Sequence, residues 1–335
     1  MPQAKLREYV AALAASPARP NECPGMDCAI VATRHEGIFS VSTVDFFYPL
    51  VECPYLQGRI GACNVMSDIY AVGCSEIDTV LMIIAASMEM DPRAADLVTT
   101  EMMRGFSECV AEAGASVTGG QTVRNPWPMI GGCASALARE AELVRPEGAR
   151  VGNVLVLTKP LGTQVAVNAW QRRPPHAHWE ARLAPAGLTL AALAELYDAA
   201  CASMASLSAP AAALLRAHGA TAATDVTGFG VLGHAANLAE HTAAPCTLRL
   251  HTLPCLPHAA ALDGALGAQG WGLRGGYSAE TSGGLLVALP SGAAAAAFCE
   301  ALGGRAWVVG EVVPRAEGAA RNTAEIAADV RMLSV

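Results

Sequence analysis

Residues 79–121 read TVLMIIAASMEMDPRAADLVTTEMMRGFSECVAEAGASVTGGQ, and this stretch decides the fold class. Its first part, Thr79–Ala85, is an apolar run of the length expected for a buried strand. A helix is predicted to open at Asp91, with a proline in its first turn, and to run to Ala113 before a glycine stop. Ala115–Thr118 then starts a second strand. A strand, a helix and a strand in this order indicate an α+β or α/β protein.

The rest of the chain shows the same mixture of strands and helices. Alternating residues predict a strand at Ile38–Val44, and apolar residues spaced by three and four predict helices at Pro2–Ala15 and Arg59–Val72. The stretch 146–152, PEGARVG, has the composition of a loop and precedes a predicted strand at Val154–Thr158. We therefore place a boundary there and predict two domains, residues 1–150 and 151–335.

Composition excludes several classes of protein. Of the 335 residues, 53% are hydrophobic and 16% charged, which excludes a disordered chain. The longest strongly apolar run, residues 80–86, is far shorter than the roughly 20 residues that a membrane span needs. The first ten residues carry Lys5, Arg7 and Glu8 and have no apolar core, so they do not form a signal peptide. We expect a cytoplasmic protein with no membrane partner.

The net charge limits the kinds of partner to expect, and the cysteine content indicates the state of the thiols. The formal net charge is −8 and no run of basic residues stands out, so we expect no nucleic-acid partner. The chain has 11 cysteines but no Cys-x-x-Cys motif, and an odd number cannot all pair. In a cytoplasmic protein this pattern is typical of reduced, mostly buried thiols.

Four aspartates and one glycine pair carry the candidate chemistry. Asp27, Asp68 and Asp225 each lie beside glycine, serine or threonine, and Asp45 ends a predicted strand. Carboxylates are ligands that Mg²⁺ prefers, and a nucleoside triphosphate needs such a cation to neutralise its charge. Gly119-Gly120-Gln121 follows a strand, and backbone without a Cβ can approach a phosphate closely. Together these segments suit a Mg²⁺–nucleotide site.

Each of these segments also has a plainer interpretation. A single aspartate before a helix is more often an N-cap, and a glycine pair after a strand is more often a simple turn. The chain contains no Walker motif. Taken as patterns alone, the segments therefore leave both interpretations open.

Seven segments, taken in order, resemble the selenophosphate synthetase family, and the resemblance runs over nearly the whole chain. The segments are STVDFFYP (42–49), GRIGACN (58–64), SDIYAVG (67–73), GASVTGGQTV (114–123), LTKPLG (157–162), ATDVTGFGVLGH (223–234) and ETSGGLL (280–286). So many matches in one order make the resemblance highly specific.

The resemblance implies a fold, a reaction and partners. The fold is a two-domain PurM-like one, similar to aminoimidazole ribonucleotide synthetase, in a homodimer whose interface is built from the first domain. The reaction converts ATP, selenide and water into selenophosphate, AMP and phosphate, with ATP and Mg²⁺ held in a cleft. Other proteins of the selenocysteine pathway are further expected partners.

The resemblance also implies roles for individual residues. The Mg²⁺ ligands are Asp27, Asp68 and Asp225. The residues on the nucleotide side are Gly25, Met26, Asp45, Asp68, Gly119, Gly120 and Gln121, of which the last three form a nucleotide-binding turn.

One departure from the family pattern concerns the start of the chain. Members of the family have a Gly-rich loop with a cysteine or selenocysteine and then a lysine, and the helix from Pro2 resembles the segment after that loop. Neither Cys23 nor Lys5 matches the loop residues. We therefore expect the fold and part of the Mg²⁺–ATP binding, but little selenophosphate formation. A non-catalytic paralogue and another ATP enzyme of the same superfamily remain alternatives.

Three other residues have structural interpretations. His234 ends the sixth segment and is interpreted as a packed, hydrogen-bonded histidine at a helix start rather than as a catalytic base. Cys28, beside Asp27, is interpreted as a buried structural thiol. Trp127 is assigned to core packing or to a contact with adenine or a partner.

Overall fold

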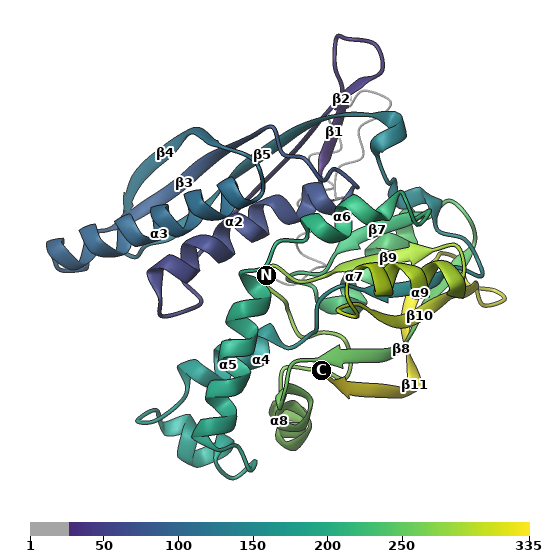
Figure 1. Cartoon of the computed structure of the whole chain (residues 1–335). Helices are drawn as coiled ribbons and strands as arrows, with labels where there is room; N and C mark the ends of the chain where they lie inside the picture. Colours follow the sequence, from purple (N-terminus) through teal and green to yellow (C-terminus); the bar gives the residue numbers. More distant parts are fainter. Residues whose placement is uncertain (1–26) are drawn as a thin grey trace.

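The computed structural model describes residues 27–335, and in them the strands form two sheets (Figure 1). The first sheet comes from residues 29–139 and the second from residues 154–334. The predicted helix Pro2–Ala15 and the candidate residues Gly25 and Met26 lie outside the described residues. The domain boundary near residue 150 stays a prediction, although the only elements between the two sets of strands are two short 3₁₀ turns.

The first sheet has the strand order β1-β2-β5-β3-β4. Its pairs are antiparallel except for β3 and β4, which are parallel because a long helix connects them. The strands are β1 (Ala29–Ala32), β2 (Ile38–Phe47), β3 (Thr79–Ser87), β4 (Val117–Asn125) and β5 (Met129–Arg139). The strand–helix–strand prediction for residues 79–121 is therefore confirmed.

Two helices, α2 (Pro54–Ala71) and α3 (Pro92–Glu112), lie along one another on one face of the first sheet (Figure 1). They approach closely where two glycines face the opposite backbone. A Cβ on Gly58 would lie 2.0 Å from the carbonyl oxygen of Met102, and one on Gly105 would lie 2.0 Å from that of Tyr55. Asp91 caps α3 as predicted, because its side chain accepts hydrogen bonds from two backbone N–H groups of the first turn.

The other face of the first sheet exposes apolar side chains. Val44 is 60% exposed, Phe46 53% and Leu81 42%, and Val123 and Leu137 are exposed as well. The register places Val44 and Leu81 opposite the same residue of β5, Cys133, so both side chains lie on one face. Trp127 is half exposed and its ring lies 6.0 Å from that of Tyr48, so the core-packing interpretation of Trp127 is wrong.

The second sheet has the order β11-β8-β10-β6-β9-β7 and is most fully buried at its β9 and β7 end. Every residue of β7 and β9 is buried, which is why β9, with the sequence LLVAL, is an apolar run without alternation. The strands are β6 (Val154–Leu157), β7 (Ala222–Asp225), β8 (Cys246–Cys255), β9 (Leu285–Leu289), β10 (Trp307–Pro314) and β11 (Thr323–Ser334).

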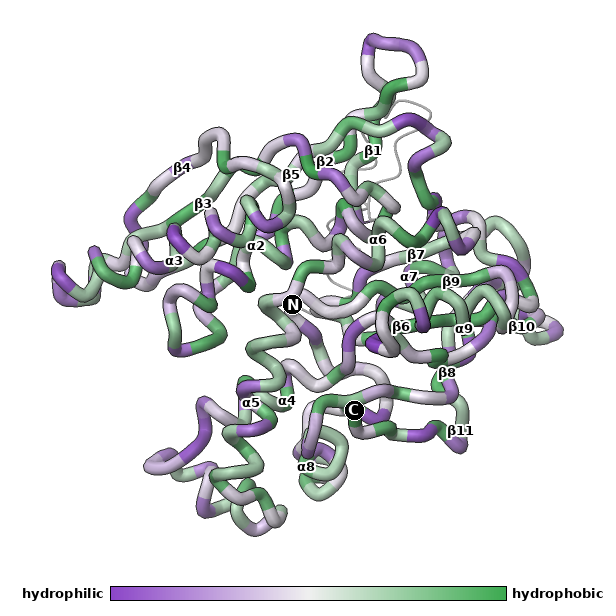
Figure 2. The backbone as a smooth tube through the Cα atoms, viewed as in Figure 1, coloured by the Kyte–Doolittle hydropathy of each residue, from purple (hydrophilic) through white to green (hydrophobic). Residues whose placement is uncertain are grey.

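Helices cover the second sheet, which separates two apolar cores. One core joins the first sheet, α2 and α3 to one face of the second sheet, and the other core lies on the opposite face. The helices are α4 (Thr163–Gln171), α5 (Leu190–Met204), α6 (Ala209–Leu215), α7 (Gly230–His241), α8 (Ala259–Leu266) and α9 (Gly292–Ala301). Figure 2 shows hydrophilic residues gathered at loops such as the tip between β1 and β2.

Helix α2 joins the two halves of the molecule, because it contacts β2 and β5 on one side and β7 on the other. This explains why 13 of its 18 residues are buried, a pattern without a single apolar stripe. In the part of the chain that the structure describes, no single helix is long and apolar enough to cross a membrane; α5 and α6, bent by 52°, pass that test only as a pair.

Candidate functional site

Four aspartates from different elements meet where α2 passes between the two sheets. Asp225 is the last residue of β7 and is 1% exposed, and Asp68 lies in the fourth turn of α2. Asp45 lies near the end of β2, and Asp27 shortly precedes β1. The structure therefore brings together the three predicted metal ligands and the predicted nucleotide-side aspartate.

Each carboxylate of this acid cluster (Asp27, Asp45, Asp68 and Asp225) accepts a hydrogen bond from a neighbouring side chain. Ser67 Oγ donates to Asp225 Oδ2 at 2.7 Å, and Thr224 Oγ1 donates to Asp27 Oδ1 at 3.1 Å. The remaining pairs are Thr43 with Asp68 and Asn64 with Asp45. Short, stiff donors of this kind fix the orientation of a ligand, as they do around metal centres.

The arrangement is electrostatically unfavourable as long as no cation balances it. Burial, together with the neighbouring charge of Asp225, raises the pKa of Asp27 and of Asp68 well above the usual range. Burial also raises the pKa of Asp45, although hydrogen bonds from the backbone of Phe46 and from Asn64 oppose the change. Buried like charges so close together need protons or a cation between them.

One oxygen of the cluster has no hydrogen-bond partner among the described residues. Asp27 Oδ2 is buried, while Oδ1 of the same carboxylate accepts from Thr224. A buried carboxylate oxygen without a donor is costly unless it binds a cation. An all-oxygen donor set with such an oxygen fits Mg²⁺, which prefers carboxylates, water and phosphate.

The predicted nucleotide-binding turn is not a turn and does not lie at the acid cluster. Gly119, Gly120 and Gln121 are central residues of β4, which pairs along its length with β3. The prediction of a turn is wrong because the hydrogen bonds of the parallel pair keep this segment extended despite its two glycines. Strand β4 forms the edge of the sheet opposite β1, so three strands separate it from the β1 edge, beside which Asp27 lies.

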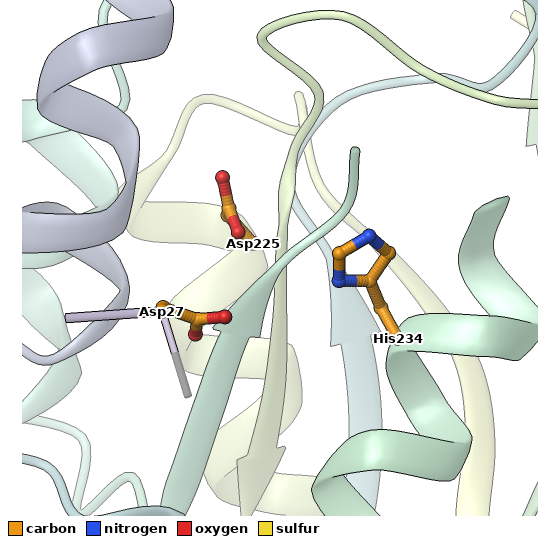
Figure 3. Close-up of side chains that lie close together, drawn as sticks. All are labelled: Asp27, Asp225 and His234. Carbon is orange, nitrogen blue, oxygen red and sulfur yellow. The ribbon is translucent and has the colours of Figure 1, made fainter. Parts of the chain in front are cut away.

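The sequence interpretation missed a fifth residue at the cluster. His234 is buried and hydrogen-bonded at the start of α7, as predicted, but its ring lies beside two of the carboxylates (Figure 3). Ligand atoms of Asp27, Asp225 and His234 all lie within 4.8 Å of one another. The fixed spacing from Asp225 to His234 in the TDVTGFGVLGH segment was the available signal, because a tight loop between a strand and a helix returns the chain to the strand end.

The segment Thr281–Gly284 packs against the site through backbone contacts. Ser282 N donates to Asn64 Oδ1 at 2.8 Å, so Asn64 joins this segment to Asp45. Lys159 Nζ donates to the carbonyl oxygen of Ser282 at 2.7 Å, and burial lowers the pKa of this lysine to about 8. The segment fits only with glycines, since a Cβ on Gly284 would lie 2.3 Å from Lys159 N.

The fold is similar to that of several solved structures. A protein from Thermus thermophilus matches with a TM-score of 0.68 at 22% identity, and each chain is covered to 95%. Thiamine monophosphate kinase from Aquifex aeolicus matches with a TM-score of 0.64 at 13% identity, covering 99% of this chain and all of the other. At these identities the likeness concerns the fold alone, and it confirms the predicted two-domain PurM-like architecture.

Sequence comparisons identify the family. Residues 25–138 match the AIR synthase related protein N-terminal domain, and residues 150–321 match the corresponding C-terminal domain.

Three curated relatives are called selenide, water dikinase. That of Trypanosoma brucei brucei is 46% identical over 96% of this chain and 83% of its own length, and that of Leishmania major is 48% identical over 95% and 83%. The human selenide, water dikinase 2 is 45% identical over 89% of this chain and 67% of its own length. Because such identity extends over both halves of the fold, the chain belongs to the selenide, water dikinase family.

Proposed function

We propose that this protein uses ATP and water to convert selenide into selenophosphate, releasing AMP and phosphate. Membership of the selenide, water dikinase family supports the reaction. The structural observation that supports the proposal for this chain is the acid cluster. Both halves of the molecule contribute to it, and its Asp27 Oδ2 has no hydrogen-bond partner among the described residues.

Asp27, Asp68 and Asp225 would hold Mg²⁺, and Asp45 would lie on the phosphate side. The cation would supply charge neutralisation for the phosphoryl group of ATP. Thr43, Ser67 and Thr224 keep their carboxylates aimed at one volume, so the protein is organised for the cation before it binds. The contacts of Asn64 tie the Ser282 segment to this volume and would help to exclude water.

The exposed face of the first sheet supports a homodimer. Val44, Phe46 and Leu81 form part of an apolar surface on a face that no described element covers, and a second copy is the natural occupant of such a surface. Gln121 pairs with Ile83 in the register, so it projects from the same face as Leu81. A nucleotide-binding role for Gly119–Gln121 would then require the second copy to bring this strand to the acid cluster of its partner.

A phosphorus NMR time course of the 335-residue chain with ATP, Mg²⁺ and selenide, under anaerobic reducing conditions, tests the proposal. New resonances of selenophosphate, AMP and phosphate in equal amounts would support it. Hydrolysis of ATP to ADP in the presence of selenide, without selenophosphate, would contradict it and favour another ATP enzyme of the superfamily.

The same spectra test the expectation of weak turnover. Broadened ATP resonances without products would agree with a chain that binds the nucleotide but turns it over little. Full-rate product formation would contradict that expectation and leave the proposed function intact. Unchanged ATP resonances would contradict the proposal that this chain binds the nucleotide.

A further inference from the structure

We propose that Lys159 is a positioning residue for the phosphate side of the acid cluster. Its buried ammonium group holds the Ser282 segment (Thr281–Gly284) in a strained conformation, and this segment in turn orients Asn64 and Asp45. The inference deepens the proposed function and rests on it, because these contacts order the side of the cluster that would receive the nucleotide. Lys159 acts through the segment and need not touch the nucleotide or the cation.

The ammonium group of Lys159 is buried and forms no ion pair with a carboxylate of the described residues. Nζ donates to the carbonyl oxygens of Ser206 and Ser282, each at 2.7 Å, and the Ser282 hydroxyl oxygen lies 3.4 Å away. Burial lowers the pKa of Lys159 to about 8, and the neighbouring Cys63 and Asp225 oppose this change. The ammonium form therefore prevails at pH 7. A charge buried among neutral oxygens is costly, and groups of this kind gather at functional sites.

The Ser282 segment is strained at the residue that the ammonium group holds. Ser282 has a φ of 46°, which lies in the left-handed region that favours glycine. The segment has no room to shift, since a Cβ on Gly283 would lie 2.0 Å from the carbonyl oxygen of Val226. Strained backbone of this kind persists only where the surrounding contacts fix it. The hydrogen bond from Lys159 is the charged contact among those that fix Ser282.

Ser282 transmits this order to the acid cluster through Asn64. Ser282 N donates to Asn64 Oδ1 at 2.8 Å, and Asn64 Nδ2 donates to Asp45 Oδ2. Both polar atoms of this one amide are therefore fixed, one by the segment and one by the carboxylate. If the segment relaxes, Asn64 is free to turn and Asp45 loses its side-chain donor. The other three carboxylates accept from side chains outside this path.

The path predicts different effects on the nucleotide and on the cation. Lys159→Met keeps the aliphatic stem and removes the ammonium group. It should weaken MgATP binding about tenfold or more, because Asp45 lies on the proposed phosphate side. Affinity for Mg²⁺ without nucleotide should stay the same or increase, since the variant removes a positive charge near the acid cluster. Calorimetric titration of the full chain measures both affinities.

Arg305→Met is the matched control for the loss of a positive charge. Arg305 lines the same cavity of about 240 Å³ as Lys159, but it is exposed and makes no contact with the Ser282 segment. This variant should change neither affinity.

Hydrogen exchange and a second-site variant test the positioning directly. In NMR spectra of the full chain without ATP or metal, the Ser282 N–H should exchange about tenfold faster or more in Lys159→Met than in wild type. Adding Ser282→Gly should restore slow exchange at position 282 and part of the MgATP affinity, because glycine adopts the left-handed conformation without strain. A purely electrostatic role of Lys159 would not be rescued in this way.

Four outcomes would overturn the inference. Exchange at Ser282 could be unchanged in Lys159→Met, the added Ser282→Gly could fail to restore MgATP affinity, or Mg²⁺ and MgATP affinities could fall equally. Lys159→Gln, which keeps a shorter polar side chain, is measured in the same way, and failure of both variants to fold would assign Lys159 to the core alone. A wild-type chain that does not bind MgATP would contradict the proposed function, whereas exchange at Ser282 would still decide the role of Lys159.

Discussion

At the scale of single residues, the site is built from aspartates whose burial disfavours the charged form of their side chains. Asp68 illustrates this conflict, because burial and the charges of Asp225 and Asp27 all raise its pKa. The hydrogen bond from Thr43 opposes the change only in part. Functional sites commonly keep such unfavourable groups at the expense of stability. The effects of removing one charge on stability and on binding should therefore have opposite signs.

Asp68→Asn should weaken Mg²⁺–ATP binding at least tenfold, since it removes a charged oxygen ligand. Without metal, the same variant should raise the free energy of unfolding at pH 8 by about 1 to 2 kcal/mol, because it relieves repulsion. Calorimetric titration measures the first effect and urea unfolding the second. Asp198→Asn, on the exposed side of α5, should change neither. A metal-free Asp68→Asn protein less stable than wild type would contradict the repulsion argument.

At the scale of elements, buried polar contacts hold the helices that surround the site. Glu280 accepts hydrogen bonds from Gly162 N at 2.7 Å and from Thr163 N at 2.9 Å, and so caps the N-terminus of α4. Burial raises the pKa of this carboxyl to about 7 even though these hydrogen bonds oppose the change. The capping interaction therefore links helix stability to pH in the neutral range.

Because the pKa of Glu280 is higher in the folded protein than its ordinary value of 4.5, its protonated form favours folding. That contribution is fully present below pH 4.5 and is lost as the pH rises through about 7. Between these limits the free energy of unfolding of wild type should fall by up to about 3 kcal/mol relative to Glu280→Gln. Urea unfolding of both proteins from pH 5 to pH 8 measures the difference, and a difference independent of pH would refute the assignment.

The contact between α2 and α3 depends on the absence of two side chains. Gly58→Ala and Gly105→Ala should each lower the free energy of unfolding by about 1 to 3 kcal/mol, since the added Cβ would meet a carbonyl oxygen of the facing helix. Gly264→Ala in α8 is the control, because nothing lies within 4 Å of its Cβ position and alanine favours a helix. Equal stability of Gly58→Ala and Gly264→Ala would contradict this close contact.

The sequence predicted local elements well and their assembly less well. The helix from Pro92 and the strand from Thr79 were predictable because a proline in the first turn, an aspartate cap and an apolar run act over short distances. The extended conformation of Gly119–Gln121 was not predictable, because pairing with β3 overrides the local preference of two glycines for a turn. The meeting of the four aspartates depends on α2 contacting both sheets, and no pattern within one segment encodes that contact.

At the scale of the whole molecule, the two sheets face different environments. The second sheet is covered on both faces, whereas the described elements cover the first on one face only, through α2 and α3. The sequence signals this difference weakly, because β2 and β5 place apolar residues on both faces and do not alternate cleanly. Apolar residues on an uncovered face add little to the stability of a monomer, so the homodimer proposed above would account for them.

Phe46→Glu should therefore convert the proposed homodimer into monomers, because it places a charge on the apolar face. Sedimentation velocity measures the change in mass, and Leu190→Glu, which charges an exposed leucine at the start of α5, should leave the mass unchanged. If Gly119–Gln121 of one copy serve the acid cluster of the other, the monomeric variant should also lose ATP affinity. A monomeric wild type, or a monomeric variant with unchanged ATP affinity, would instead show that each chain forms a complete nucleotide site, and Gln121 would then lie outside it.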